Sequence, residues 1–195
     1  MKGQPVITVG GPHGTGKSTY ARALANALQL RYVCAGQIFR ELARERKMSL
    51  ESFSHYAANH QEVDEMIDKR TKEEGAKRNV VIDAQLGAWV VKQAEVRLLL
   101  FASNEVRFAR IAHRDRISYE QARKETLARE EIQKARYRRY YGIDVDDTSV
   151  YTVRIDTGLD SIDRTKRFVI DAVRSALEHS QVSKSEVEYS GGSLS

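Results

Sequence analysis

The chain has 195 residues, of which 41% are hydrophobic and 30% are charged, with a formal net charge of +5. This composition supplies a core for one domain and excludes a chain that is disordered throughout. Cys34 is the only cysteine, which excludes an internal disulfide, and no apolar run approaches the roughly 20 residues of a membrane-spanning helix. The N-terminus is too short and too weakly apolar for a secretion signal, so we expect a cytoplasmic protein without a membrane partner.

The excess of basic residues indicates the kind of ligand that the chain suits. A sequence pI near 9.3 favours a negatively charged partner. Such partners range from a nucleotide to a nucleic acid, and the net charge does not choose between them.

Short runs rich in β-branched residues recur along the chain, with helical patterns between them. An alternation of strands and helices is typical of an α/β fold, in which helices cover both faces of a parallel sheet. The five predicted strands are residues 6–9, 32–34, 80–83, 96–101 and 150–155.

The first predicted helix begins at Lys17, directly after a glycine-rich loop. Three further helices form an insertion after the second strand, at residues 37–47, 50–59 and 62–74. After the fourth strand come a helix over residues 104–114 and a helix that Ser118 caps and that reaches about residue 140. The last amphipathic helix covers residues 162–177, and its predicted buried face consists of Ile162, Phe168, Val169, Ala172, Val173 and Leu177. Residues 179–195 lack periodicity and are predicted to form a disordered tail, which leaves residues 1–178 as the domain.

The glycine-rich loop, residues 11–18, matches the motif G-x-x-x-x-G-K-[ST] at every fixed position. It follows an apolar strand and precedes a helix, which is the context that this phosphate loop requires. Its glycines let consecutive N–H groups turn inward around an anion, and the N-terminus of the helix adds positive potential. We expect Lys17 to reach the β- and γ-phosphates of ATP and the Ser18 hydroxyl to ligate Mg²⁺. The residues predicted to hold the ATP phosphates are Gly11, Pro12, His13, Gly14, Thr15, Gly16, Lys17, Ser18 and Thr19.

The predicted strand at residues 80–83 ends in a carboxylate, Asp83. This arrangement is the one expected for the acid that accompanies Mg²⁺ at such sites. Strands also end in Asp because Asp favours turns, so the position has a purely structural interpretation as well. We favour the functional interpretation, in which Asp83 joins Ser18 at the metal.

Arginines cluster between residues 107 and 139. Arg107, Arg110 and Arg114 fall on one helical face, and Arg129 and Arg136 are seven residues apart on the next helix. Guanidinium groups supply bidentate donors to the anionic transition state of phosphoryl transfer. Interspersed glutamates favour a solvated role for most single arginines, while the segment as a whole is interpreted as a mobile lid. A chain of this length leaves little room for motor or transport machinery, which favours a small kinase.

Several stretches, taken in order, resemble the nucleoside monophosphate kinases, and among these the archaeal-type cytidylate kinases. The resemblance extends from residue 6 to residue 177. The phosphate loop is common to many protein families, whereas the stretches after the second strand and before the fifth are much narrower signals. The matching stretches are "GPHGTGKSTYARALA", "CAGQIFRELARERKMSLESFSHYA", "EVDEMIDKR", "NVVIDAQLGAW" and "YGIDVDDTSVY".

The resemblance implies a P-loop NTPase fold with a five-stranded parallel sheet, a helical insertion that binds the nucleoside monophosphate and an arginine-rich lid. The insertion would cover residues 37–75 and the lid residues 110–140. The implied reaction is ATP-dependent phosphorylation of CMP or dCMP, with Mg²⁺ on the ATP phosphates. The implied acceptor-side residues are Gln37, Arg40, Asp83 and Gln85, with Arg40 gripping the monophosphate. The implied catalytic residues, which would bracket the phosphates during transfer, are Lys17, Arg110, Arg114, Arg129 and Arg136.

Two departures from the family pattern concern the acceptor. The family usually has Asp at the position of Gln37, and Glu-Gly-Arg where this chain has Asp83-Ala84-Gln85. An amide at Gln85 cannot replace the charge and the forked donors of a guanidinium. Arg78 or Lys77, which lie nearby in the sequence, are candidates to compensate.

Two alternatives remain open at this point. The first is a kinase with another acceptor, such as UMP, a different nucleotide or a small metabolite, and the departures at Gln37 and Gln85 motivate it. The second is a nucleic-acid-binding ATPase, motivated by the basic lid. The second is disfavoured because the arginines alternate with glutamates and no separate nucleic-acid-binding motif is present. We expect a small-molecule substrate and a monomer.

Overall fold

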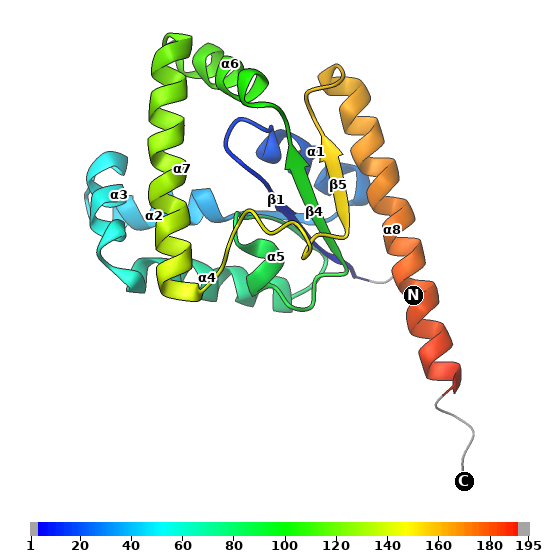
Figure 1. Ribbon diagram of the computed structural model, residues 1–195. Coiled ribbons are helices and arrows are strands. Elements are labelled where there is room, and N and C mark those ends of the chain that lie inside the picture. Colours follow the sequence, from blue (N-terminus) through cyan, green and yellow to red (C-terminus); the bar gives the residue numbers. More distant parts are fainter. Residues whose placement is uncertain (1–3, 191–195) are drawn as a thin grey trace.

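The protein is described by a computed structural model, which covers residues 4–190. Its centre is a parallel sheet of five strands in the order β2-β3-β1-β4-β5 (Figure 1). The sheet confirms the predicted α/β architecture. The strands are β1 (Val6–Gly10), β2 (Arg31–Cys34), β3 (Val80–Asp83), β4 (Val96–Phe101) and β5 (Val153–Asp156).

Helices connect successive strands and account for the rest of the regular structure. They are α1 (Lys17–Leu28), α2 (Ala35–Glu45), α3 (Leu50–Ala58), α4 (Gln61–Ala76), α5 (Gly87–Val90), α6 (Asn104–Asp115), α7 (Tyr119–Tyr141) and α8 (Ile162–Ser190). In the described part of the chain, no helix is both long and apolar enough to cross a membrane.

Successive side chains of the central strands point to opposite faces of the sheet, and those on both faces are buried. Ile7 and Val9 pack with side chains of α1 and α8 in one core cluster. Val6, Val80 and Ile82 pack with α5 and with two tyrosines of α7 in another. Both faces of the sheet are therefore covered, as expected for parallel strands whose residues are apolar throughout.

The helices α2, α3 and α4 lie between β2 and β3 and form a small core of their own. Phe53 and Leu42 are fully buried in it. These helices occupy the segment expected to form the insertion, and in Figure 1 they lie at the side of the sheet opposite to α8.

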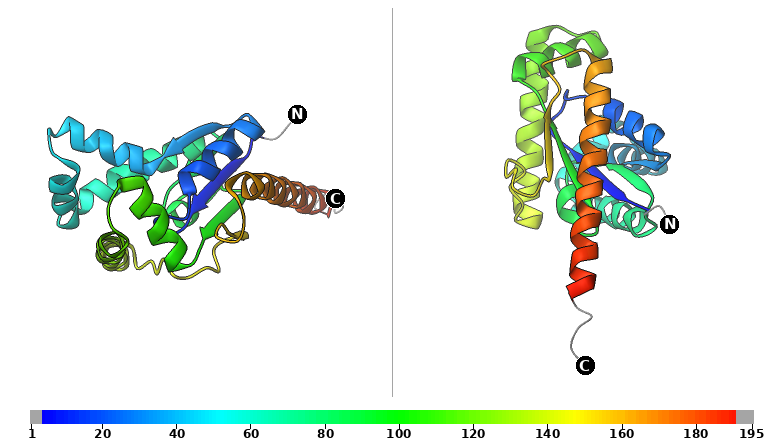
Figure 2. Two further views of the ribbon diagram at one scale, coloured as in Figure 1. Left: turned by 90° about the horizontal axis from the view of Figure 1, so that it is seen from above. Right: turned by 90° about the vertical axis from the view of Figure 1, so that its right-hand side faces the viewer.

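The segment expected to form the lid is a pair of helices, α6 and α7, at the carboxyl end of β4 (Figures 1 and 2). Ser118 caps α7 as predicted, since its hydroxyl accepts a hydrogen bond of 3.2 Å from the N–H of Gln121. Gly142 ends the helix in the left-handed conformation, with φ at 63°.

Three local expectations differ from the structure. β5 begins at Val153 rather than at residue 150, because residues 148–151 form a turn, and Asp147 just before it accepts a hydrogen bond from the N–H of Ser149. The short α5 was not predicted, since four residues carry no helical period. Phe168 and Ile162 are 62% and 54% exposed, because Val169 and Val173 are the residues of α8 that face the sheet.

The expectation of a disordered tail is wrong for residues 179–190, which continue α8. That segment contains neither Pro nor Gly, so no residue breaks the helix before Gly191. The helix extends away from the body of the molecule at this end (Figures 1 and 2). Residues 191–195, the remainder of the predicted tail, lie outside the described residues.

Candidate active site

The phosphate loop connects the end of β1 to the start of α1 at the carboxyl edge of the sheet. Gly11, Gly14 and Gly16 have positive φ values of 134°, 81° and 84°. A Cβ on Gly11 would lie 2.0 Å from the carbonyl oxygen of Leu100, so this position has room for glycine alone. No side chain caps α1, which leaves the N–H groups of its first turn available to an anion.

Lys17 lies inside this loop, where its Nζ donates a hydrogen bond of 2.9 Å to the carbonyl oxygen of Pro12. Burial lowers the pKa of Lys17 from 10.5 to about 8, while the negative charges of Asp83 and Glu130 oppose that shift. The hydroxyl of Thr15 donates to the same Pro12 oxygen at 2.9 Å. Thr19, the last predicted phosphate-loop residue, is exposed in the first turn of α1.

The structure brings Ser18 and Asp83 together, with the Ser18 hydroxyl donating to Asp83 Oδ2 at 2.6 Å. The sheet explains the meeting, because Val9 at the end of β1 is in register with Asp83 at the end of β3. Two residues of β2 also point to Asp83 Oδ2, the Tyr32 hydroxyl at 2.9 Å and the Cys34 thiol at 3.6 Å. Burial and the adjacent carboxylate raise the pKa of Tyr32, which keeps it a hydrogen-bond donor.

The donor set at Ser18 and Asp83 fits a magnesium ion that arrives with a nucleotide. Proteins hold Mg²⁺ through one or two of their own oxygens together with substrate phosphates, rather than through a complete protein cage. Within residues 4–190, no group of three or more His, Cys, Asp or Glu side chains is arranged to hold a metal ion. The Ser18 hydroxyl and the Asp83 carboxylate lie beside the phosphate loop and match a site that holds Mg²⁺ through two protein oxygens together with substrate phosphates.

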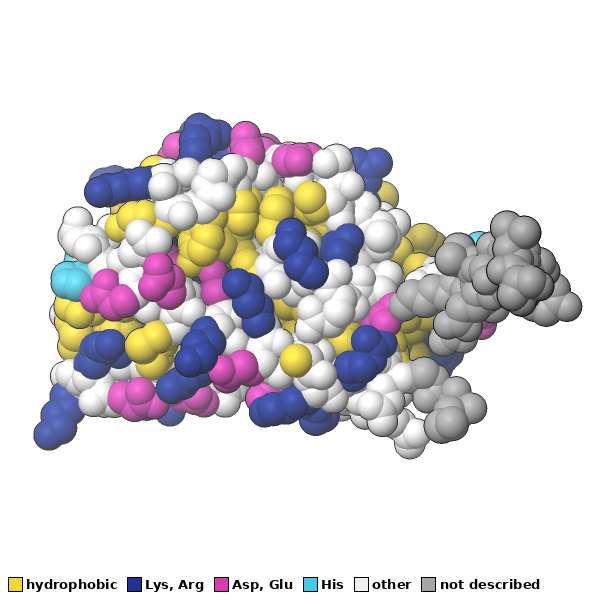
Figure 3. Space-filling view, turned by 90° about the horizontal axis from the view of Figure 1, so that it is seen from below, with side chains coloured by type: hydrophobic (Ala, Val, Ile, Leu, Met, Phe, Trp, Pro, Cys, Tyr) yellow, Lys and Arg dark blue, Asp and Glu magenta, His cyan; other side chains and the backbone are white. Residues whose placement is uncertain are grey.

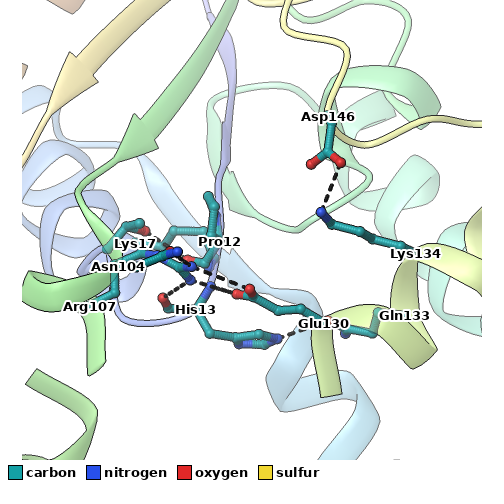
Figure 4. A network of polar contacts seen from close by, with 10 residues as sticks. Pro12, His13, Lys17, Asn104, Arg107, Glu130, Gln133, Lys134 and Asp146 are labelled. Carbon is teal, nitrogen blue, oxygen red and sulfur yellow. Dashed lines mark hydrogen bonds and ion pairs between the residues drawn. The ribbon is translucent and has the colours of Figure 1, made fainter. Parts of the chain in front are cut away.

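Helices α6 and α7, the segment predicted to form a lid, reach the phosphate loop at His13 (Figure 4). The backbone N–H of His13 donates to Glu130 Oε1 at 3.0 Å, and its carbonyl oxygen accepts from Arg107 at 2.9 Å. The ring Nε2 of His13 lies 2.8 Å from the side-chain oxygen of Gln133. Burial, with the positive charges of Arg129 and Lys17, lowers the pKa of His13 to about 4, so the imidazole is neutral near pH 7.

Two of the four predicted lid arginines, Arg110 and Arg114, lie on α6. Arg110 donates to the hydroxyl and to the carbonyl oxygen of Thr157, at 3.0 and 2.5 Å. The Thr157 hydroxyl in turn donates to the carbonyl oxygen of Thr15. Arg110 is therefore connected to the backbone of the phosphate loop through Thr157. Arg114 is exposed and bonds to both carboxylate oxygens of Asp115, at 2.7 and 2.8 Å.

The other two predicted lid arginines lie on α7. Arg136 forms a buried ion pair with Asp64 of α4, with 2.9 Å between Nε and Oδ2. Arg129 forms no ion pair with a carboxylate of the described residues. Its positive charge lowers the pKa of both Lys17 and His13, which places it beside the phosphate loop. Among the described residues, Arg129 is thus the predicted lid arginine that lies near the phosphate loop and has no ion pair with a carboxylate.

The acceptor-side residues are spread over two elements. Gln37 and Arg40 are exposed on α2, where the Gln37 amide donates to Glu41 at 3.0 Å. Arg40 forms no ion pair within the described residues. Gln85 follows Asp83 by two residues and is partly buried between β3 and α5.

Sequence reasoning missed several residues that the structure brings to the site. Tyr32 and Thr157 carry no motif, and their places depend on the order of the strands. Arg107 was placed on one helical face with Arg110 and Arg114, but its partner Glu130 is 23 residues away. The signal available in the sequence was a glutamate, Glu130, on the helix that follows the one carrying Arg107. The many other charged residues of this segment made that pair impossible to single out.

Known proteins with a similar fold include small kinases. A shikimate kinase from Acinetobacter baumannii matches with a TM-score of 0.57 and 16% identity over 88% of this chain and 93% of that one. A gluconokinase from Sinorhizobium meliloti matches with a TM-score of 0.57 and 15% identity over 97% of this chain and 98% of that one. At such identities the similarity shows the fold alone, which is that of P-loop kinases.

Similarity in sequence is more specific. A cytidylate kinase of Staphylothermus marinus is 44% identical over 174 residues, which cover 89% of this chain and 98% of that protein. A cytidylate kinase of Ignicoccus hospitalis is 45% identical over 155 residues, or 79% of this chain and 90% of that protein. The model of the cytidylate kinase-like family matches residues 6–159, which include the phosphate loop, Asp83 and the helices α6 and α7. The chain therefore belongs to the cytidylate kinase-like family.

Proposed function

We propose that the protein transfers the γ-phosphoryl group of ATP to CMP or dCMP, and so acts as a nucleoside monophosphate kinase. The observation that carries this proposal is the Ser18–Asp83 pair of 2.6 Å beside the glycine-rich phosphate loop, in a chain of the cytidylate kinase-like family. The loop supplies a site for the triphosphate, the pair supplies ligands for its metal ion, and the family supplies the acceptor.

The reaction is a direct displacement. An oxygen of the CMP phosphate forms a bond to the γ-phosphorus of ATP, the bond to the bridging β,γ-oxygen breaks, and ADP leaves with the electron pair. The acceptor oxygen is already a competent nucleophile, so no covalent intermediate with the protein is required. Catalysis then consists of positioning and of positive charge around the transferring group.

The donor side is held by the phosphate loop. N–H groups at the start of α1 bind the phosphates, and Lys17 turns from the Pro12 oxygen to the β- and γ-phosphates. Ser18 and Asp83 would hold Mg²⁺, which would offset the negative charge of the ATP phosphates. Arg129, beside the loop, adds a guanidinium where charge spreads in the transition state.

The acceptor side is held by the insertion. Arg40 is exposed on α2 without an ion pair among the described residues, so its guanidinium can bind the CMP phosphate through two donors. Gln37 and Gln85 supply amides rather than charges near this site. Arg110, Arg114 and Arg136 are bound to protein partners in this structure, and we assign them a role in transfer only after those partners are exchanged for phosphate.

A coupled assay of ADP release tests the acceptor. The panel consists of CMP, dCMP, UMP, AMP and GMP, each with Mg²⁺ and ATP, with and without single-stranded RNA. We expect CMP and dCMP to stimulate ADP release and the purine monophosphates and RNA to leave it at the background rate. If no monophosphate stimulates ADP release and RNA does, the proposal is wrong.

A kinase for a different acceptor is the second candidate, and Gln85 is the observation that favours it. An amide at that position lacks the charged contact that the family's arginine would make to the acceptor, which would lower the selectivity for a particular nucleotide. Preferential stimulation by UMP would support this candidate. A nucleic-acid substrate has less support, because basic side chains on the face seen in Figure 3 are scattered among acidic ones.

A further inference from the structure

The backbone of His13 in the phosphate loop is held from both sides by one ion pair (Figure 4). Glu130 of α7 accepts the hydrogen bond of the His13 N–H, and Arg107 of α6 donates to the His13 carbonyl oxygen. Arg107 and Glu130 are bonded to each other at 2.7 Å and 3.3 Å. Both polar groups of a single loop residue are thus oriented by the two lid helices.

This ion pair is well shielded from solvent. The side chains of Arg107 and Glu130 are 6% and 14% exposed. Asn104 accepts a further hydrogen bond of 2.5 Å from Arg107, which fixes the plane of the guanidinium. A buried ion pair costs desolvation energy and is weak evidence for a role in stability, so a second role has to be sought in what it touches.

The contact also sets how closely the loop approaches the lid. A Cβ on Gly14 would lie 2.6 Å from the carbonyl oxygen of Arg107, so the loop backbone rests directly on α6. Glu130 brings a negative charge to a loop that binds phosphates. Because Arg107 is bonded to both oxygens of Glu130, its positive charge offsets the repulsion between that carboxylate and a triphosphate.

The neighbour of Glu130 on α7 is Arg129, whose positive charge lowers the pKa of Lys17. Adjacent residues of a helix are held rigidly relative to each other, so the bond between Glu130 and the loop also fixes the backbone and Cβ positions of Arg129. An ion pair that bonds to the loop can therefore place the lid arginine relative to the phosphates.

We infer that Arg107 and Glu130 are positioning residues for phosphoryl transfer. They hold the phosphate loop in its anion-binding conformation and place Arg129 beside it. The inference rests on the proposed kinase function and goes beyond it, because it assigns both side chains a role that is exerted through the backbone of the loop.

Two single variants test the inference. Glu130→Gln keeps the size of the side chain and removes its charge, and Arg107→Lys keeps the charge and loses the forked donors. We expect each to lower kcat by about tenfold or more and to raise the dissociation constant of ATP severalfold, with the KM for CMP within about twofold of the wild type. Wild-type kcat and ATP affinity in both variants would overturn the inference. If Glu130→Gln does not fold, Glu130→Asp carries the same expectation.

Asp146→Asn is the matched control. It breaks an ion pair of 2.8 Å between Asp146 and Lys134, which lies one turn beyond Glu130 on α7 but does not touch the loop (Figure 4). Kinetic constants equal to those of the wild type are expected for this variant. An equal loss of kcat in Asp146→Asn would mean that any ion pair of α7 has the same effect, and would overturn the inference.

The reversed pair, Arg107→Glu with Glu130→Arg, separates positioning from stability. It restores an ion pair between the helices but offers a donor to the His13 N–H and an acceptor to the His13 carbonyl oxygen. We expect the melting temperature to return toward that of the wild type and kcat to remain about tenfold or more below it. Recovery of kcat in the reversed pair would contradict a positioning role.

The ATP affinity distinguishes a failure of this inference from a failure of the proposed function. Calorimetric titration with ATP requires no acceptor. A wild type that binds ATP but does not phosphorylate CMP would remove the kinase proposal, whereas the variants would still show whether the ion pair organises the loop.

Discussion

Burial sets the protonation of the two ionisable side chains in the phosphate loop. Desolvation is the main reason why the pKa of Lys17 falls from 10.5 to about 8 and that of His13 falls from 6.5 to about 4. Near pH 7 Lys17 is charged and the imidazole of His13 is neutral. The single positive charge that the loop itself presents to a phosphate is therefore that of Lys17.

A pH dependence of ATP binding follows from the lowered pKa of Lys17. Bound phosphates favour the charged lysine, so the pKa of Lys17 rises in the complex. As the pH rises above about 8, the free protein loses this proton and must regain it on binding, so the dissociation constant of ATP increases by up to about tenfold per pH unit.

Calorimetric titration with ATP from about pH 7 to about pH 9.5 measures this slope. Lys17→Met is the control, because it removes the titrating group and should bind ATP weakly with no such slope. A wild-type slope equal to that of Lys17→Met would contradict the assignment of the shift to Lys17.

Arg40 offers a test of the acceptor site at the scale of a single side chain. Arg40→Ala should raise the KM for CMP by about tenfold or more and leave the KM for ATP within about twofold, because the variant removes a bidentate phosphate contact on one substrate. The fold should be unaffected, since Arg40 is exposed.

Arg44→Ala is the matched control for Arg40. Arg44 is exposed on the same helix, one turn further on. Steady-state kinetics with each substrate varied in turn measures both KM values. An unchanged KM for CMP in Arg40→Ala would place the acceptor phosphate elsewhere.

At the scale of elements, α7 meets α4 through buried charges. Asp64 and Asp68 lie one turn apart on α4, and Arg136 of α7 pairs with Asp64 at 2.9 Å. Burial and the charge of Asp68 raise the pKa of Asp64 to about 6, although Arg136 opposes the shift. Burial raises the pKa of Asp68 as well. This contact between the helices is therefore sensitive to pH.

The sign of that sensitivity is set by the raised pKa of Asp64. Between about pH 4 and about pH 6, the folded protein binds a proton at Asp64 that the unfolded chain has lost, so stability decreases as the pH rises through this window. The decrease is on the order of 2 to 3 kcal/mol at most. Asp64→Asn should lack this decrease.

Urea unfolding at several pH values checks this expectation, with Asp163→Asn as the control because Asp163 is a solvent-exposed carboxylate of α8. The difference in unfolding free energy between wild type and Asp64→Asn should change through the window, and the difference for Asp163→Asn should stay constant. A constant difference for Asp64→Asn would contradict the raised pKa.

Most elements could be predicted from the sequence, since a continuous apolar run such as residues 96–101 indicates a buried strand and a periodic segment indicates a helix. The end of α8 could not, because polar residues without a breaker fit a helix as well as a tail. The meeting of Ser18 with Asp83 was predictable because both follow strands of one parallel sheet. The partner of Arg107 was not, since an ion pair across 23 residues depends on how α6 and α7 cross.

At the scale of the whole molecule, α7 joins the phosphate loop to the helices α3 and α4. Glu130 bonds to the phosphate loop, whereas Arg136 and Tyr140 contact the insertion, the Tyr140 hydroxyl donating to the Ala58 carbonyl oxygen at 3.3 Å. Figures 1 and 2 show α7 lying beside the insertion and across the carboxyl edge of the sheet. A single helix that touches both sides can couple the occupation of one to the geometry of the other, as expected of a kinase lid.

The central claim is transfer of a phosphoryl group from ATP to CMP at the phosphate loop. The most direct test follows labelled γ-phosphate from ATP into CDP, using wild type and Lys17→Met with CMP and Mg²⁺. We predict labelled CDP in equal amount to the ADP formed by the wild type, and none above background with Lys17→Met. Label released as free phosphate, or labelled CDP formed equally by Lys17→Met, would contradict the claim.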